Sequence, residues 1–156
     1  MHWSLEQVRL DALVEETVDA MRPAAAAGSV AVTTELDPAI PTAHANPEHL
    51  QRVLFNLIQN AIRHTPPDGA VTVRARRAGP EVELEVADTG DGISSEDRAR
   101  VFEPFVRVGA DAARSRDGAG LGLAIARAIV EAHGGRIWIA DRDPGVAFCF
   151  TVPAAP

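Results

Sequence analysis

The sequence contains no lysine, so all fifteen of its basic residues are arginine. This absence excludes the lysine of a Walker A phosphate loop, the strand lysine of a eukaryotic-type protein kinase, and every Schiff-base mechanism. The chain has one cysteine, Cys149, which excludes an intramolecular disulfide and a multi-cysteine metal site. A single thiol fits a reducing compartment, and we expect a cytoplasmic protein.

Long apolar runs and excess positive charge are also lacking. No stretch of about 18 apolar residues occurs, so we expect neither a membrane span nor direct membrane contact. The first ten residues have no apolar signal core. The net charge of −7 argues against nucleic-acid binding, which needs basic side chains to displace phosphate counterions. With 46% hydrophobic and 24% charged residues over 156 positions, the chain is expected to be one globular domain.

Apolar periodicity predicts the fold class. Helical spacing predicts long helices over 10–27, 47–64 and 120–133, and a short capped helix over 95–102. Strands are expected over 30–36, 71–77, 81–88, 136–140 and 146–152, with a short one near Ala43. Arg74 and Arg76 are expected to form exposed pairs with glutamates across the 71–88 hairpin. The pattern predicts an α/β two-layer sandwich, a mixed five-stranded sheet packed on about three helices.

Two asparagines mark the first candidate site, on the helix expected over 47–64. Asn56 and Asn60 are four residues apart and share a helical face, with Arg63 and His64 one turn further on. One interpretation is that the amides cap neighbouring loops. The other is an Mg²⁺ and phosphate site, since magnesium keeps most of its waters and needs only one or two protein oxygens.

A second candidate follows the strand expected over 81–88, in the sequence Asp88-Thr89-Gly90-Asp91-Gly92-Ile93. A carboxylate at a strand end can accept from one donor, such as the exocyclic amine of adenine. Gly90 and Gly92 let the backbone approach a planar base without a Cβ in the way. The alternative is an ordinary Asp-Gly turn.

A third candidate is the glycine-rich segment 118–123, which leads directly into an apolar helix. Glycines at a helix N-terminus present free N–H groups and form an anion site. A dinucleotide-binding fingerprint is excluded, because Leu123 stands where its last glycine belongs and a loop, not a strand, precedes the segment.

In this order and spacing the motifs resemble those of the ATP-binding catalytic domain of bacterial sensor histidine kinases, in the GHKL superfamily. The resemblance covers nearly the whole chain and implies the Bergerat-type ATP-binding fold. Its motifs are the N box (56–66), the first glycine box (88–92), the F box (102–105), the second glycine box (118–123) and the terminal His133-Gly134-Gly135.

The resemblance implies a role for each matching residue, with ATP and Mg²⁺ as cofactors. Asn60 corresponds to the Mg²⁺ ligand, Asp88 to the carboxylate that accepts from adenine, and Leu121 and Gly122 to backbone donors for the phosphates. Residues 105–119 correspond to an ATP lid, whose Arg114 and Arg116 would stabilise phosphoryl charge, although plain solvation of two loop arginines is the alternative. The implied nucleotide-binding set is Asn56, Asn60, Arg63, His64, Asp88, Gly90, Gly92, Ile93, Phe105, Gly118, Gly120, Leu121, Gly122 and Leu123.

Asn56 separates branches of the superfamily. ATPases and anti-sigma-factor serine kinases carry a glutamate base at this position, whereas an asparagine cannot take a proton at neutral pH. The resemblance therefore implies a protein-histidine kinase, with Asn56 in its catalytic set. It would donate the γ-phosphoryl to a histidine on a separate helical dimerisation domain, for relay to a response-regulator aspartate. Residues 1–9 are expected to be a linker and 10–156 the catalytic domain. The alternatives are an anti-sigma-type serine kinase and a nucleotide-sensing pseudokinase.

Overall fold

The computed structural model describes residues 4–104 and 121–156. Two short strands, β1 (Glu6–Val8) and β3 (Ala43–Ala45), pair with each other at one end of the molecule. The long helices are α1 (Leu10–Ala27), α2 (Pro47–His64) and α5 (Gly122–Ala132), and α3 (Ser95–Arg98) is a single turn. The main strands are β2 (Ala31–Leu36), β4 (Ala70–Ala78), β5 (Glu81–Asp88), β6 (Ile137–Asp141) and β7 (Val146–Pro153).

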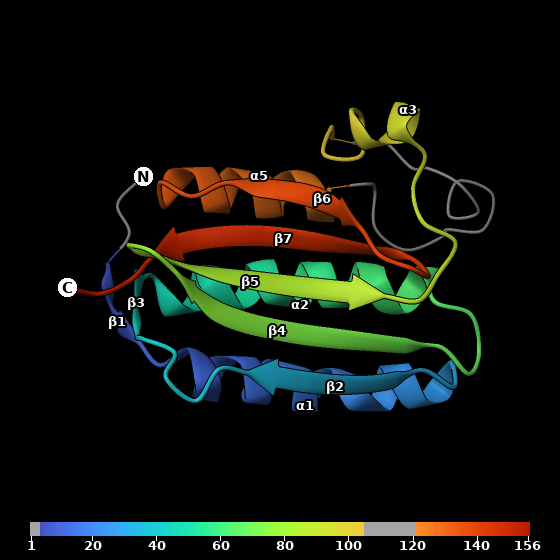
Figure 1. Ribbon diagram of the computed structural model, residues 1–156, viewed down its shortest axis with the longest axis horizontal. Helices are drawn as coiled ribbons and strands as arrows, with labels where there is room; N and C mark the ends of the chain where they lie inside the picture. The colour runs from blue at the N-terminus through green and yellow to red at the C-terminus, as the bar shows by residue number, and fades with distance from the viewer. Residues whose placement is uncertain (1–3, 105–120) are drawn as a thin grey trace.

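The main sheet has five strands in the order β2-β4-β5-β7-β6. Only β2 and β4 run parallel, and the other neighbouring pairs are antiparallel. All three long helices lie on one face of this sheet, behind the strands in Figure 1. The structure therefore confirms the predicted two-layer α/β sandwich with a mixed five-stranded sheet.

Side-chain alternation along the strands forms the core between the two layers. Val82, Leu84 and Val86 on β5 have no exposed surface, and Phe148 and Phe150 from β7 lie on the same side. Each such side chain stabilises the fold by about 1.5–3 kcal/mol relative to an exposed one.

Helix α2 begins and ends where the sequence predicts. The side chain of Asn46 accepts from the backbone N–H of His49 at 3.0 Å, and Pro47 occupies the first turn, where its missing N–H costs nothing. The apolar stripe of α2 is buried against the sheet: Leu50, Val53, Leu54, Leu57, Ile58 and Ala61. This packing fixes the rotation of α2 and leaves its asparagines along an accessible edge.

Residues 6–8 form strand β1, which the sequence did not predict. Two predicted helix bounds were wrong. Helix α3 ends at Arg98 rather than Phe102, and α5 starts at Gly122 rather than Gly120. Helix α1 spans Leu10–Ala27 as predicted, with Pro23 inside it. Within the described ranges, no helix is both long and apolar enough to span a bilayer.

Candidate functional site

Elements that carry several of the predicted site residues meet at one end of the sandwich, on the right in Figure 1. The C-terminal ends of α2 and β5 and the turn between β6 and β7 all lie at that end. The polar edge of α2 contacts segments from both glycine boxes, as the following contacts show.

Asp88 ends strand β5 and is only 4% exposed. Its Oδ1 accepts from the backbone N–H of Gly90 at 2.8 Å. Among the described residues no arginine pairs with it. Burial raises the pKa of the Asp88 carboxyl, although backbone hydrogen bonds from Gly90 and Val146 and the charge of His64 act in the opposite direction. A buried carboxylate that no arginine neutralises is costly to fold, and such groups are typical of functional sites.

Gly90 packs directly onto the end of α2. A Cβ added at Gly90 would lie 2.4 Å from the carbonyl oxygen of His64, a separation that no alanine could adopt without backbone movement. This close approach holds the first glycine box against the N box and brings the Asp88 carboxylate near the His64 ring. Gly92 has a φ of +82°, a left-handed backbone conformation that favours glycine.

Asn56 connects α2 to the second glycine box. Its Nδ2 donates to the carbonyl oxygen of Gly122 at 3.0 Å, across 66 positions of sequence. Among the described residues, no side chain caps the N-terminus of helix α5 or accepts from its first N–H groups. Leu121 precedes this helix, and Gly122 and Leu123 form its first residues.

Asn60 lies one turn beyond Asn56 on the same face of α2 and is half-buried. Its side chain forms no hydrogen bond to another described residue, so its amide oxygen is available to a ligand. Residues 4–104 and 121–156 contain no group of three His, Cys, Asp or Glu side chains arranged to hold a metal ion. A single amide oxygen with substrate phosphates and waters suits Mg²⁺, which rarely uses an all-protein cage. The residues present therefore fit a nucleotide-borne magnesium ion.

Two further predicted residues lie next to these motifs. Arg63 is exposed at the end of α2, and Ile93 is half-buried after the first glycine box. The remaining calls fall outside the described residues: Phe105, Arg114, Arg116, Gly118, Gly120 and the lid at 105–119.

Two residues beside Asp88, Gly145 and Val146, were not predicted from the sequence. A Cβ added at Gly145 would lie 1.9 Å from the carbonyl oxygen of Asp88, and the backbone N–H of Val146 acts on the Asp88 carboxylate to lower its pKa. The sequence Asp143-Pro144-Gly145 predicts a turn, but only the pairing of β5 with β7 brings that turn next to Asp88.

Glu85 also differs from expectation. The sequence predicts exposed arginine–glutamate pairs, and Arg74 does pair with Glu85 at 2.8 Å, as Arg76 pairs with Glu83 at 3.1 Å. However, Glu85 is only 7% exposed and is held by a second arginine, Arg142. Glu85 is buried because Arg142, which lies in the β6–β7 turn, covers its carboxylate.

Comparison with known proteins gives concordant results. The family described as histidine kinase-, DNA gyrase B-, and HSP90-like ATPase matches residues 45–156. Adaptive-response sensory kinase SasA of Synechococcus elongatus is 40% identical over 122 residues, which cover 77% of this chain and 31% of SasA. The chain thus spans less than a third of the length of that relative.

Solved structures also resemble the whole fold, and two of them illustrate the similarity. Full-length ShkA in complex with AMPPNP superimposes with a TM-score of 0.87 at 32% identity, covering 99% of this chain and 32% of ShkA. Histidine kinase ThkA in complex with response regulator protein TrrA gives a TM-score of 0.82 at 28% identity, covering 97% of this chain and 42% of that one.

Proposed function

This chain belongs to the family of histidine kinase-, DNA gyrase B- and HSP90-like ATPases, and from that premise we propose that it is the catalytic domain of a sensor histidine kinase. In this role it binds Mg·ATP and donates the γ-phosphoryl to a histidine on a separate helical dimerisation domain. The phosphoryl group then passes to an aspartate of a response regulator.

The observation that carries the proposal is the buried Asp88 carboxylate beside the end of α2. Its Oδ1 accepts from Gly90, whose backbone packs on His64, so the carboxylate is fixed next to the N box. An exocyclic amine of adenine is a donor that such a group can bind. Gly90, Gly92 and Ile93 would line the base pocket, and His64 would lie beside the nucleotide.

Asn56, Asn60 and the start of α5 would bind the triphosphate. Asn60 would hold Mg²⁺, which when bound neutralises charge on the phosphate oxygens. Arg63, at the end of the same helix, adds positive charge, and the uncapped N–H groups at Leu121, Gly122 and Leu123 suit phosphate oxygens. Gly118 and Gly120 belong to the same phosphate-binding segment in this proposal.

The chemistry is phosphoryl transfer by positioning and charge stabilisation. The bond from the γ-phosphorus to its bridging oxygen breaks, a bond to the acceptor histidine nitrogen forms, and ADP leaves. Asn56 already donates to Gly122 and cannot accept a proton, so it does not activate water. We therefore expect slow hydrolysis and transfer only when an acceptor histidine is supplied.

The domain assignment completes the proposal. In this proposal residues 10–156 are the catalytic domain, and residues 1–9 connect it to the dimerisation domain. Residues 105–119 act as a lid. Within the lid, Phe105 would contact the nucleotide, and Arg114 and Arg116 would contact the phosphates. We place the domain in the cytoplasm. The similarity to ThkA, whose structure was solved with response regulator protein TrrA, supports a response regulator as the final acceptor.

Phosphotransfer to isolated acceptors tests this function. The purified chain is mixed with labelled Mg·ATP and a panel of histidine-bearing two-helix dimerisation domains from related kinases. We expect acid-labile phosphate on at least one domain, and none when its histidine is replaced by glutamine. Acid-stable label on a serine of an anti-anti-sigma-type partner would instead indicate a serine kinase. ATP binding without transfer to any acceptor would indicate a pseudokinase.

A further inference from the structure

The turn between β6 and β7, residues 142–145, packs directly against Asp88. Gly145 has a φ of +89°, and its Cα approaches Asp88 so closely that any side chain would overlap the Asp88 carbonyl oxygen. The Oδ1 of Asp88 lies 3.1 Å from the position that a Gly145 Cβ would occupy, and the backbone N–H of the next residue, Val146, acts on the carboxylate to lower its pKa. The orientation of that carboxylate therefore depends on where this turn lies.

Arg142 fixes the turn from within. Its backbone N–H donates to the carbonyl oxygen of Gly145 at 3.1 Å, which closes the turn. Its guanidinium contacts both carboxylate oxygens of Glu85, through Nη2 to Oε1 and through Nε to Oε2 at 3.3 Å. A planar guanidinium on two carboxylate oxygens is a rigid, oriented contact that a point charge cannot reproduce.

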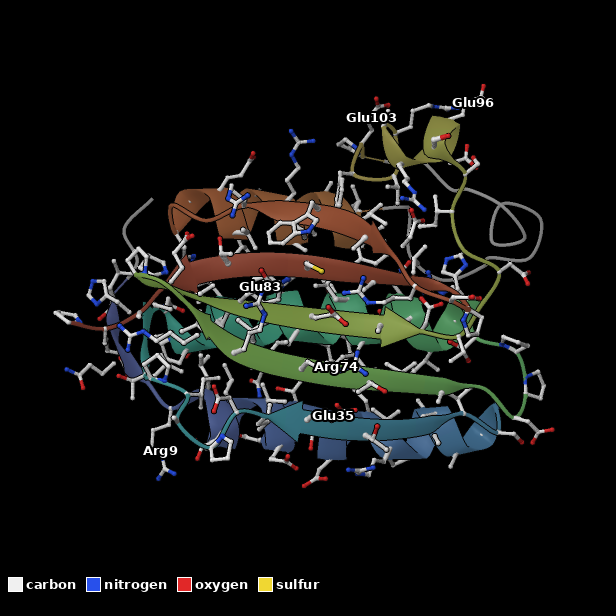
Figure 2. All side chains as sticks on the ribbon, viewed as in Figure 1. Arg9, Glu35, Arg74, Glu83, Glu96 and Glu103 are labelled. Atoms are coloured by element: carbon white, nitrogen blue, oxygen red, sulfur yellow. The ribbon has the colours of Figure 1, made fainter. Side chains whose placement is uncertain are left out.

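Glu85 is a fixed anchor for this contact. It lies on β5 three residues before Asp88, in the middle of the sheet, and its side chain is 10% exposed. Arg74 on β4 holds the same carboxylate at 2.8 Å and also reaches Glu35 on β2 at 3.3 Å. Figure 2 shows Arg74, Glu35 and Glu83 on the face of the sheet that looks toward the viewer, away from the helices.

A second ion pair holds the other side of the turn. Arg98, at the end of α3, pairs with Asp141 at the start of the turn. The Nε of Arg98 donates to the carbonyl oxygen of Ile93 at 2.9 Å, directly after the first glycine box. The turn is thus tied to strand β5 on one side of Asp88 and to the segment following Gly92 on the other.

We propose that Arg142 is a positioning residue for base recognition: by holding the β6–β7 turn against Glu85, it aims the Asp88 carboxylate at the exocyclic amine of the base. The inference rests on the proposed function and adds a residue outside the recognised motifs. Because Arg142 acts through Asp88, it contributes to discrimination between a 6-amino purine and a 6-oxo purine, and much less to phosphate binding.

The geometry predicts that Arg142 can be removed without unfolding the chain. Glu85 keeps its contact with Arg74, so its buried charge is not left without a partner. The lost contact frees the turn, and the backbone of Gly145 then no longer holds Asp88 and its carboxylate in one orientation.

Calorimetric binding of Mg·ATP and Mg·ITP to the full chain and its Arg142→Ala variant tests the proposal. ITP has the same triphosphate but an oxo group in place of the amine. We expect the variant to lose about tenfold in ATP affinity, which corresponds to one oriented hydrogen bond, with little change for ITP. The ratio of the two dissociation constants therefore falls. Arg142→Lys keeps the charge without the two-point contact and should recover only part of the ratio.

Arg76→Ala is the matched control. It removes an arginine–glutamate pair on the same face of the sheet, with Glu83 at 3.1 Å, without touching the turn. Its ATP-to-ITP ratio should equal that of the unmodified chain. Urea unfolding of all variants separates this specificity effect from a change in stability.

The outcomes are distinguishable. If Arg142→Ala is folded and binds ATP with an unchanged ATP-to-ITP ratio, the positioning role is overturned while the proposed function stands. If Arg142→Ala unfolds, Glu85→Gln, which weakens the same contact and retains its oxygen acceptor, must lower the ratio. Unfolding of both variants would make the cluster purely structural and would also overturn the proposal. If the unmodified chain binds neither nucleotide, the proposed function itself fails.

Discussion

The Nδ2 of Asn56 lies 3.0 Å from the carbonyl oxygen of Gly122 and joins the middle of α2 to the first residue of α5. The amide nitrogen therefore faces α5, and the amide acts there as a donor. A glutamate at this position would place carboxylate oxygens against a carbonyl oxygen. The contact explains why a donating amide, rather than a carboxylate, suits this position.

The first prediction concerns that contact. Asn56→Asp replaces the donating amide with a second acceptor facing Gly122, so we expect a loss of about 1 kcal/mol in the free energy of unfolding. The affinity for Mg·ATP should also fall, because an added negative charge faces the phosphates. Urea unfolding and calorimetry measure the two effects. Gln59→Asp, on the exposed side of the same helix, is the control and should leave affinity nearly unchanged.

Magnesium dependence is the second prediction. Asn60→Ala should weaken ATP binding about tenfold with Mg²⁺ present and have almost no effect in EDTA, because the amide oxygen acts on the metal. Calorimetry under both conditions gives the comparison, with Gln59→Ala as the control. An equal loss in EDTA would assign Asn60 a structural role instead.

The third prediction separates stability from binding at Asp88. Burial raises the pKa of this carboxyl, so its contribution to stability is fully present below its ordinary value of 3.8 and is lost as pH rises through the folded value. The ionised group at neutral pH therefore works against folding. Asp88→Asn should leave the free energy of unfolding within about 1 kcal/mol of the unmodified chain while ATP affinity falls about 100-fold.

Asp91→Asn is the matched control for this variant. Asp91 is an exposed carboxylate in the same glycine box, and its replacement removes the same charge without touching the base pocket. We expect unchanged ATP affinity. If Asp88→Asn binds ATP as well as Asp91→Asn does, adenine recognition does not depend on Asp88.

Acid stability provides the fourth prediction. Burial of Glu85 opposes its ionisation, but the hydrogen bonds and charges of Arg142 and Arg74 prevail and lower its pKa. Its contribution is present above the ordinary value of 4.5 and is lost as pH falls through the lowered folded value. Glu85→Gln should cost about 1–2 kcal/mol at pH 7, after allowing for the half-exposed arginines, and less below pH 4. Urea unfolding from pH 7 to 3 checks this; a pH-independent difference would contradict it.

Much of the architecture could be predicted because its signals are local. Helix α2 has a capping asparagine, a proline in its first turn and a continuous apolar stripe, and both of its ends match the prediction. The β4–β5 hairpin follows equally from alternation and an intervening turn. The resemblance supplied the order of the boxes, and the packing of Gly90 on His64 brings two of them together.

The missed features depend on contacts distant in sequence. Strand β1 has only three residues and forms because β3 pairs with it, which no local pattern indicates. Glu85 alternates like an exposed residue, but Arg142 covers it from 57 positions away. The sequence identifies Gly145 only as an ordinary turn glycine. Its contact with Asp88 follows from the register of β7 on β5.

The most direct test of the nucleotide site is an amide NMR titration of the labelled chain with the Mg²⁺ complex of a non-hydrolysable ATP analogue. We predict saturable shifts that cluster on the amides of Asn60, Asp88, Gly90 and Gly122, with the Asp88→Asn variant showing none at matched concentrations. An absence of shifts at these positions would contradict the account. So would shifts confined to the groove between α1 and α2, which is lined by Thr17, Gln51 and Phe55.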